Sequence, residues 1–209
     1  MSLDLQTIQT YNNSAKQMAA HFQQYKGGTA KEEIDKAFLL AKERSPKVIE
    51  VGCGAGKEAT EIVKRADQYE GFDPSIKLLE IARVHVPSAS FVQADALSYS
   101  YPPGTDIVFA FAPLLHLNKE DFGAACRKIS DSLRVGGILC MSLKEANAYT
   151  EQIQKDEFGT RRFYLYSPKL AQELAGPSLK LIDQTHTTAG IKAKKWMSLF
   201  FIKDTLGQR

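Results

Sequence analysis

Residues 47–58 constrain the fold of this 209-residue chain more than any other stretch. A largely apolar run at positions 48–51, directly after a Ser-Pro pair that stops helices, predicts a buried parallel strand. Residues 57–66 then have the composition of a helix. Between strand and helix stand three glycines, Gly52, Gly54 and Gly56. Because glycine has no Cβ, such a turn brings backbone amides close to a ligand, so the stretch predicts a binding site for a nucleotide-like molecule.

The spacing of the glycines separates three kinds of binding turn. The phosphate-binding pattern GxxxxGK followed by Ser or Thr is excluded, because only three residues separate the outer glycines and Glu58 replaces the required hydroxyl. The dinucleotide pattern G-x-G-x-x-A fits residues 54–59, but this register begins two residues late and leaves Gly52 and Cys53 without a role. A third register begins at Glu50 and uses all three glycines. A turn that merely connects strand and helix also remains open.

Composition places the chain in a broad class. With 44% hydrophobic residues it is long enough to bury a full-sized core, so we expect a single domain over residues 1–209. The net charge of +3 indicates neither nucleic acid nor a membrane surface as partner, and we see no signal peptide or membrane span. Three scattered cysteines in apolar segments predict free thiols in a cytoplasmic protein, with no metal site: Cys53, Cys126 and Cys140. The oligomeric state is left open.

Strand-like and helix-like segments alternate along most of the chain. Further strands are expected at 68–73, 89–93, 106–111 and 138–143, and helices at 76–86, 119–133 and 168–175. This alternation predicts an α/β fold with a doubly wound, parallel sheet. The last two strands, 179–186 and 196–203, have no helix between them and should pair antiparallel, which a six-stranded dinucleotide fold would not do. Two helices precede the first strand, the first at about 5–25, so residues 1–45 are expected to form a helical cap.

Two acidic residues follow the second and third strands. Asp73 stands about twenty residues after the glycine turn, where a carboxylate can accept from both hydroxyls of a ribose or cap the next helix. Asp95, in the sequence Val-Gln-Ala-Asp-Ala, has two readings: its carboxylate can accept a hydrogen bond from an exocyclic amino group, or it can cap a loop. Together with the register from Glu50 and the Leu-Arg-Val-Gly-Gly stretch at 133–137, they resemble the class I S-adenosylmethionine (SAM)-dependent methyltransferases over residues 47–203.

The resemblance implies a seven-stranded sheet of order 3-2-1-4-5-7-6, with an antiparallel last strand, and SAM as the cofactor, released as S-adenosylhomocysteine. In that family the acid matching Asp73 binds the ribose, and the acid matching Asp95 accepts from the adenine amino group. Tyr11, in Tyr-Asn-Asn-Ser-Ala, resembles an N-terminal aromatic residue that closes over the amino-acid end of SAM. The cofactor-binding residues thus implied are Glu50, Gly52, Cys53, Gly54, Gly56, Asp73, Pro74, Asp95, Ala96, Phe111 and Tyr11.

The chemistry is expected just past the fourth strand, at residues 111–116, because open α/β sheets bind ligands at the carboxyl ends of their strands. This segment lacks the Asn/Asp-Pro-Pro-Tyr/Phe signature of enzymes that methylate base amines, and resembles the Phe/Leu-rich exit of small-molecule methyltransferases. His116 is the candidate general base, with a histidine that only bonds the cleft wall as the alternative. Residues 144–166 are expected to form an inserted lid. Its candidate substrate residues, which could clamp an anion or lie solvated, are Arg161, Arg162 and Tyr164.

The expected function is transfer of a methyl group from SAM to a small molecule by in-line displacement. The modest charge argues against a large polyanionic substrate. Three alternatives remain open: an RNA or protein methyltransferase, a SAM-binding protein without catalysis, and an NAD-dependent oxidoreductase.

Overall fold

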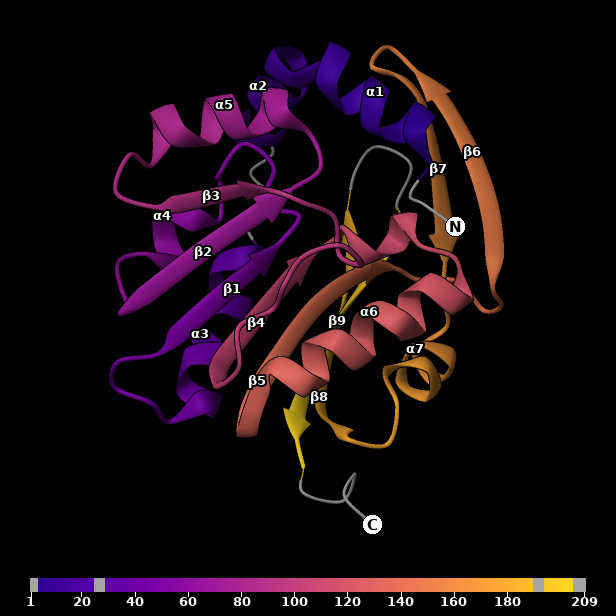
Figure 1. Ribbon diagram of the computed structural model, residues 1–209. Helices are drawn as coiled ribbons and strands as arrows, with labels where there is room; N and C mark the ends of the chain where they lie inside the picture. Colours follow the sequence, from indigo (N-terminus) through magenta and orange to yellow (C-terminus); the bar gives the residue numbers. More distant parts are fainter. Residues whose placement is uncertain (1–3, 25–28, 190–193, 205–209) are drawn as a thin grey trace.

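A computed structural model describes residues 4–24, 29–189 and 194–204, and these fold around a seven-stranded sheet (Figure 1). The strands of the sheet are β1 (Lys47–Val51), β2 (Gln68–Asp73), β3 (Ser90–Gln93), β4 (Thr105–Phe111), β5 (Leu133–Lys144), β8 (Leu179–Ala189) and β9 (Lys194–Lys203). β6 (Thr150–Asp156) and β7 (Gly159–Leu165) form a separate two-stranded hairpin. The helices are α1 (Leu5–Asn13), α2 (Ala15–Gln24), α3 (Thr29–Ala41), α4 (Ala59–Ile62), α5 (Ile76–His85), the 3-10 turn η1 (Leu114–His116), α6 (Lys119–Ser132) and α7 (Pro168–Ala175).

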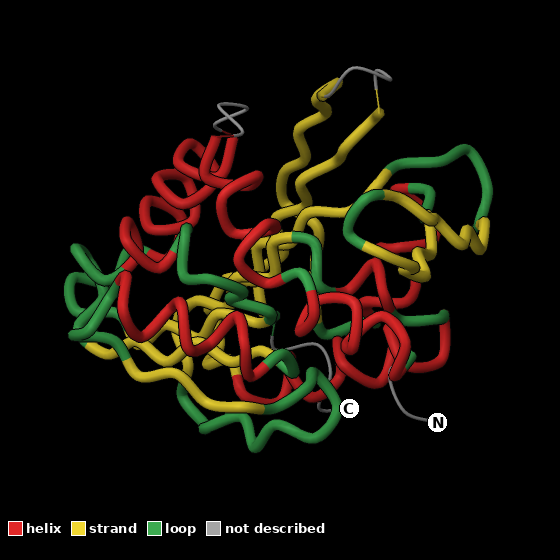
Figure 2. The backbone as a smooth tube through the Cα atoms, turned by 90° about the horizontal axis from the view of Figure 1, so that it is seen from above, coloured by secondary structure: helices red, strands yellow, loops and turns green. Residues whose placement is uncertain are grey.

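The order of strands in the sheet is β3-β2-β1-β4-β5-β9-β8. Since β8 and β9 are the sixth and seventh strands of this sheet along the chain, the observed order confirms the predicted 3-2-1-4-5-7-6. β1 to β5 pair in parallel, and β9 pairs antiparallel with both β5 and β8. Figure 2 shows the β8–β9 pair projecting beyond the helices. The α/β class and the reversed last strand are therefore confirmed.

Both faces of the sheet are covered because each central strand is apolar on both sides. Residues 105–110 of β4 are all buried, as the sequence predicts for the strand at the sheet centre. One face of β1, β4 and β5 packs with apolar residues of α6 and α7, and the other packs against α3. This burial fixes the strands, and with them the positions of the loops at their carboxyl ends.

Two helix predictions need correction. The helix expected at about 5–25 is broken into α1 and α2 at Ser14, whose hydroxyl and amide both donate to the carbonyl of Thr10. Such a local side-chain bond competes with the helical pattern. Only Ala59–Ile62 of the helix expected at 57–66 is α-helical. Its N-cap residue, Glu58, makes no side-chain capping bond, and turns flank the helix on both sides.

Two further elements differ from the sequence prediction. The Gly-Gly turn expected before the fifth strand lies inside β5, where it forms an irregularity: Thr105 pairs with Leu133, but Ile107 already pairs with Ile138. The expected lid segment forms the β6–β7 hairpin, which the sequence did not predict. The hairpin stands next to α1 at the edge of the molecule where β1, β2 and β4 end (Figure 1).

Candidate functional site

The residues predicted to bind the cofactor gather at one edge of the sheet. β1, β2, β3 and β4 run parallel, so their carboxyl ends lie on the same side of the sheet. Asp73 and Phe111 are the last residues of β2 and β4, and the glycine turn and Asp95 come just after β1 and β3. α1, with Tyr11, lies against α5 and β7 at this edge. The structure thus brings together segments that are far apart in the sequence.

Each glycine of the turn has a left-handed backbone, with φ of 64° at Gly52, 53° at Gly54 and 77° at Gly56. A Cβ on Gly52 would lie 2.4 Å from the Cβ of Pro113, because the turn packs against the exit of β4. A Cβ on Gly56 would lie 3.2 Å from that of Ala82 in α5. A Cβ on Gly54 would meet no atom within 4 Å. The outer glycines therefore allow close packing, whereas the middle one faces open space, as a ligand-facing residue should.

Asp73 connects the glycine turn to the end of β2. Its Oδ2 accepts from the amide of Gly54 at 3.0 Å, and its Oδ1 accepts from the amide of Ser75 at 2.8 Å. The side chain is 8% exposed, and this burial raises its pKa to about 6 against the opposing effect of the two amides. The carboxylate retains further acceptor positions for a ligand donor. Ser75, not Asp73, caps α5, by accepting from the amide of Leu78.

Glu50 lies beneath the turn and is 1% exposed. Burial, followed by the negative charges of Glu58 and Asp73, raises its pKa well above the usual range. Its Oε2 accepts from the hydroxyl of Tyr69 at 2.5 Å. Gly71 makes room for this contact, because a Cβ there would lie 2.5 Å from the Tyr69 hydroxyl. Sequence reasoning missed Tyr69, although its place in β2, beside β1, is a usable signal.

The other predicted cofactor residues have distinct environments. Cys53 is buried against α5, and burial raises the pKa of its thiol. The Oδ1 of Asp95 accepts from the amides of Leu97 and Ser98, at 2.7 Å and 2.9 Å, and so caps the loop after β3. Ala96 is buried, and the carbonyl of Pro74 accepts from the side chain of Gln93.

Tyr11 and His116 are brought together although 105 positions separate them. The Tyr11 hydroxyl lies 3.0 Å from Nε2 of His116, and Nδ1 of His116 lies 2.6 Å from the carbonyl oxygen of Arg162. Because a carbonyl only accepts, Nδ1 carries the proton, and Nε2 accepts from Tyr11. Burial lowers the pKa of His116 to about 4; the Arg162 carbonyl opposes this, and the charges of Lys144 and Arg161 add to it.

Two local features hold this pair at the edge. Ala112, directly after β4, has φ of 69°, which costs a residue with a Cβ roughly 1–2 kcal/mol. Such strain is commonly found at functional sites. Asn12, next to Tyr11, accepts from the Ser75 hydroxyl at 2.8 Å and from the Lys77 amide at 3.2 Å. α1 is therefore bonded to the start of α5, close to Asp73.

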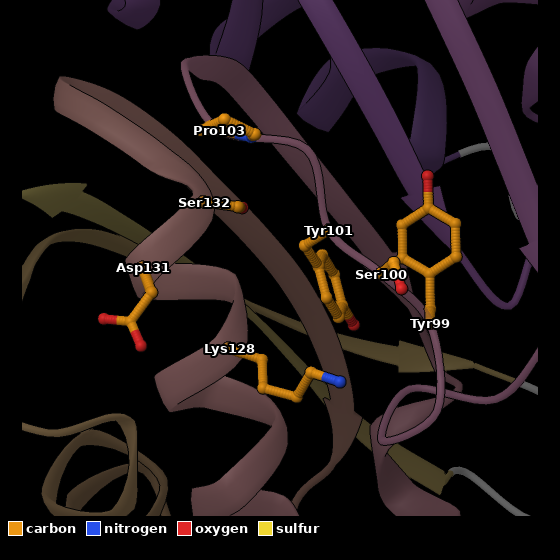
Figure 3. A pocket seen from close by; sticks show the side chains of 7 residues that line it. All are labelled: Tyr99, Ser100, Tyr101, Pro103, Lys128, Asp131 and Ser132. Carbon is orange, nitrogen blue, oxygen red and sulfur yellow. The ribbon is translucent and has the colours of Figure 1, made fainter.

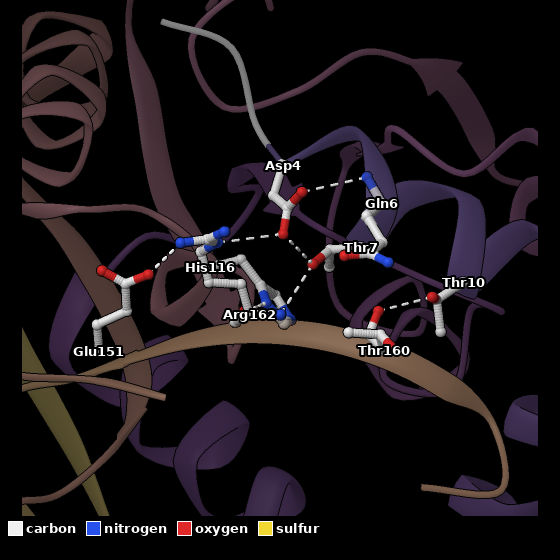
Figure 4. A network of polar contacts seen from close by, with 8 residues as sticks. All are labelled: Asp4, Gln6, Thr7, Thr10, His116, Glu151, Thr160 and Arg162. Carbon is white, nitrogen blue, oxygen red and sulfur yellow. Dashed lines mark hydrogen bonds and ion pairs between the residues drawn. The ribbon is translucent and has the colours of Figure 1, made fainter. Parts of the chain in front are cut away.

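The three candidate substrate residues on β7 separate into two groups. Arg161 is 6% exposed and forms an ion pair with Asp156, while its guanidinium lies 5.8 Å from the centre of the Tyr11 ring. Arg162 forms ion pairs with Asp4 and Glu151 (Figure 4). Tyr164 stacks on Tyr149, 5.9 Å between ring centres, on the same side of the strand as Arg162. Of these three side chains, only that of Arg161 joins the cluster around Tyr11 and His116, while Arg162 reaches His116 through its backbone carbonyl.

A hollow of about 250 Å³ lies elsewhere, between the loop after β3 and the second half of α6 (Figure 3). It is lined by Tyr99, Ser100, Tyr101, Pro103, Lys128, Asp131 and Ser132, and none of the predicted site residues is among them. Geometry at the carboxyl edge therefore defines the candidate site better than this hollow does.

The described residues hold neither a metal cluster nor a membrane-spanning helix. Within residues 4–24, 29–189 and 194–204, no group of three His, Cys, Asp or Glu residues is placed to hold a metal ion. None of the helices in these ranges is long and apolar enough to cross a membrane.

Part of the chain is similar to a known protein family. The sequence model described as "Methyltransferase domain" matches residues 48–137. Trans-aconitate 2-methyltransferase of Rhizobium etli is 32% identical over 101 residues, 47% of this chain and 39% of that protein. The homologous enzyme of Azoarcus sp. is 25% identical over 151 residues, 71% of this chain and 53% of that protein. The chain thus spans only about two-fifths to half the length of these curated relatives.

Solved structures agree on the fold. The 1,6-didemethyltoxoflavin-N1-methyltransferase of Burkholderia thailandensis, solved with S-adenosylhomocysteine, superposes with a TM-score of 0.74 at 14% identity, covering 94% of this chain and 87% of that one. The [4+2]-cyclase SpnF superposes with a TM-score of 0.71 at 17% identity, covering 94% and 95%. Residues 48–137 therefore match the methyltransferase domain family, and the described chain has the class I, Rossmann-like methyltransferase fold.

Proposed function

We propose that this protein transfers a methyl group from SAM to a small-molecule acceptor. The observation that carries the proposal is the bond between Asp73 and the amide of Gly54. This bond places a carboxylate, which can only accept hydrogen bonds, next to a turn whose middle glycine faces open space. The two together suit a nucleoside with two ribose hydroxyls. The family match and the relatives' names support methyl transfer, and NAD has no comparable support.

The remaining cofactor contacts are proposed from the same edge. Asp95 and the amide of Ala96 would hold the adenine, and Glu50 would keep the glycine turn in place through its buried carboxylate. Tyr11 would close over the amino-acid end, because α1 is already bonded to α5 next to Asp73. We further propose residues 1–45 as a cap and 144–166 as a lid within one domain spanning 1–209.

When bound, SAM supplies a methyl carbon on a sulfonium sulfur: a lone pair of the acceptor forms the new bond to this carbon, and the bonding pair of the broken C–S bond stays with sulfur. The protein's task is mainly to align these three atoms and to exclude water. The strained exit of β4 would set the position of Phe111 and His116 beside the methyl. His116 is neutral near pH 7, and its Nε2 already accepts from Tyr11, so we assign it to positioning Tyr11.

The experiment is a turnover assay on the purified chain with SAM and a panel of small-molecule acceptors that includes trans-aconitate. Formation of S-adenosylhomocysteine and of a product heavier by one methylene would support the proposal, and Asp73→Ala should abolish both. Binding of SAM without turnover on any acceptor would favour a SAM-binding protein of another activity. Methylation of RNA or protein alone would replace the small-molecule proposal.

A further inference from the structure

β6 is the outer strand of the β6–β7 hairpin, and β7 lies between it and α1 (Figure 1). The backbone of β7 is engaged on the side of α1 and η1, where the carbonyl of Thr160 and both backbone groups of Arg162 bond side chains of these two elements. In an antiparallel pair, opposite residues either bond each other or both direct their amides and carbonyls away. The residues opposite these two, Lys155 and Ile153, therefore direct theirs to the outer edge of β6.

This outer edge has no strand beside it in the described parts of the chain. Glu151, two positions before Ile153, presents its backbone in the same direction. β6 is largely exposed, and its one apolar residue, Ile153, is 61% exposed. A two-stranded hairpin is at best marginally stable by itself, and an unpaired edge is a template for another strand. The edge is therefore suited to receive a further strand.

The sequence of β6, Thr-Glu-Gln-Ile-Gln-Lys-Asp, is complementary to its own reverse. When two copies pair antiparallel with Ile153 opposite Ile153, Glu151 of each copy lies opposite Lys155 of the other. Gln152 likewise lies opposite Gln154. Residues two apart share a face of a strand, so the two charge pairs flank the apolar pair on one face. A match that a two-fold axis repeats in this way is that of an isologous interface.

The edges of the large sheet do not offer such a match. β3 has only four residues, and β8 has an irregularity between Leu181 and Asp183. Bulges and short strands protect edges against pairing, and charged side chains on an edge usually oppose it as well. On β6 the charges instead favour one register, because each charge meets its opposite.

We propose that the outer edge of β6 binds a second copy of this chain about a two-fold axis, so that the two hairpins form one four-stranded sheet. Glu151 already forms an ion pair with Arg162 of its own chain, and in the dimer it would lie between two cations. Because β7 is bonded to α1, the pairing would support the hairpin beside the helix that carries Tyr11. A strand pair alone is smaller than a standard interface, so the dimer should be reversible. The inference depends neither on SAM nor on the reaction proposed above.

The test is sedimentation velocity of the whole chain over a concentration series up to about 100 μM, where a dimer with a micromolar dissociation constant is mostly assembled. The wild type should pass from monomer to dimer. Ile153→Pro removes the outward amide and leaves the bonds to β7 in place, because proline is tolerated on the solvent side of an edge strand. It should weaken the dimer at least ten-fold. The matched control Ile153→Val keeps the amide and an apolar side chain, and should weaken the dimer less than three-fold.

An exchange of charges tests the register. Glu151→Lys and Lys155→Glu each place like charges opposite one another at both ends of the strand pair, so each variant alone should dimerise at least ten-fold more weakly. In an equal mixture of the two variants every charge again meets its opposite. Heterodimers should then form with an affinity within about three-fold of the wild type. A structural defect in either chain would not be repaired by mixing.

The contrary outcomes are equally defined. A wild type that stays monomeric up to the highest concentration overturns the proposal. So does a dimer that Ile153→Pro leaves unchanged, because its interface then lies elsewhere. A mixture that dimerises no better than its two components would overturn the pairing of Glu151 with Lys155, and the proposal with it. Should Ile153→Pro not fold, as judged by its melting curve, the mixture of charge variants decides.

Discussion

Among single residues, Asp73 supports both the glycine turn and the proposed ribose contact, and its pKa of about 6 gives these two roles opposite responses to pH. In the folded protein without ligand, the pKa of Asp73 is raised above the 3.8 of an unperturbed aspartate. The contribution of Asp73 to the free energy of unfolding is therefore present below about pH 4 and lost as pH rises through 6. That loss is roughly 3 kcal/mol. Affinity for S-adenosylhomocysteine should instead rise over the same window, because the ionised carboxylate accepts from the ribose.

Asp73→Asn separates the two effects, because asparagine does not titrate. Relative to this variant, the wild type should lose unfolding free energy between pH 4 and 7 while gaining affinity for S-adenosylhomocysteine. Urea unfolding and calorimetric titration at several pH values measure the two quantities. Parallel pH dependences, or identical curves for wild type and variant, would contradict the role given to Asp73.

A matched pair of glycines tests the open face of the turn. Gly54 and Gly104 both have left-handed backbones, and a Cβ on either would meet no atom within 4 Å. Gly54→Ala and Gly104→Ala should therefore cost similar stability, about 1–2 kcal/mol each. Only Gly54→Ala should weaken S-adenosylhomocysteine, by ten-fold or more, because its methyl enters the ligand's space. Equal affinity in the two variants would remove Gly54 from the site.

At this scale the sequence predicts residues whose role depends on local spacing. The glycines and Asp73 follow strands at fixed distances, so their meeting could be inferred. Tyr69 could not, because its role comes from a contact across strands and from burial that no local pattern records. The division between Arg161 and Arg162 likewise depends on which side of β7 is buried.

At the scale of elements, α1 is joined to the β6–β7 hairpin by hydrogen bonds (Figure 4). Thr10 donates to the carbonyl of Thr160 at 2.7 Å, and Thr7 accepts from the amide of Arg162 at 3.0 Å. Thr10→Val should remove about 1 kcal/mol of this contact and speed S-adenosylhomocysteine dissociation about five-fold. Stopped-flow displacement measures the rate.

Thr150→Val in the same hairpin is the control, since the one partner of the Thr150 hydroxyl among the described residues is the nearby carbonyl of Ala148. Equal dissociation rates in the two variants would mean that the contact between α1 and the hairpin does not hold the ligand.

The contact of α3 with β9 makes a second prediction at this scale. Glu33 is buried, one of its oxygens accepts from Ser198, and the other, Oε2, has no partner among the described residues. Burial raises its pKa, so its contribution to stability is present below the usual glutamate pKa and lost as pH rises through the folded value. Glu33→Gln should thus be more stable than wild type at pH 8, by about 1–2 kcal/mol, and equal to it at pH 4. Thermal unfolding at both pH values decides; a less stable variant at pH 8 would contradict this account.

The elements also mark where prediction from sequence ends. Strand and helix alternation predicted the α/β class, since each buried element must be apolar on a defined face, and the family resemblance supplied the order of the seven strands. The β6–β7 hairpin was missed because β6 exposes both of its faces, so no alternation of polar and apolar residues appears. The break between α1 and α2 depends on a single bond of Ser14.

For the whole molecule, the central claim is that the carboxyl edge of the sheet binds SAM. The most direct measurement is thermal unfolding of wild type and Asp73→Ala with S-adenosylhomocysteine and, separately, with NAD. At a hundred times its dissociation constant a ligand stabilises the native state by about 2.7 kcal/mol. For a chain of this size that is a rise in melting temperature of roughly 5–10 °C. We predict this rise with S-adenosylhomocysteine alone, and its loss in Asp73→Ala. A rise with NAD alone would contradict the claim.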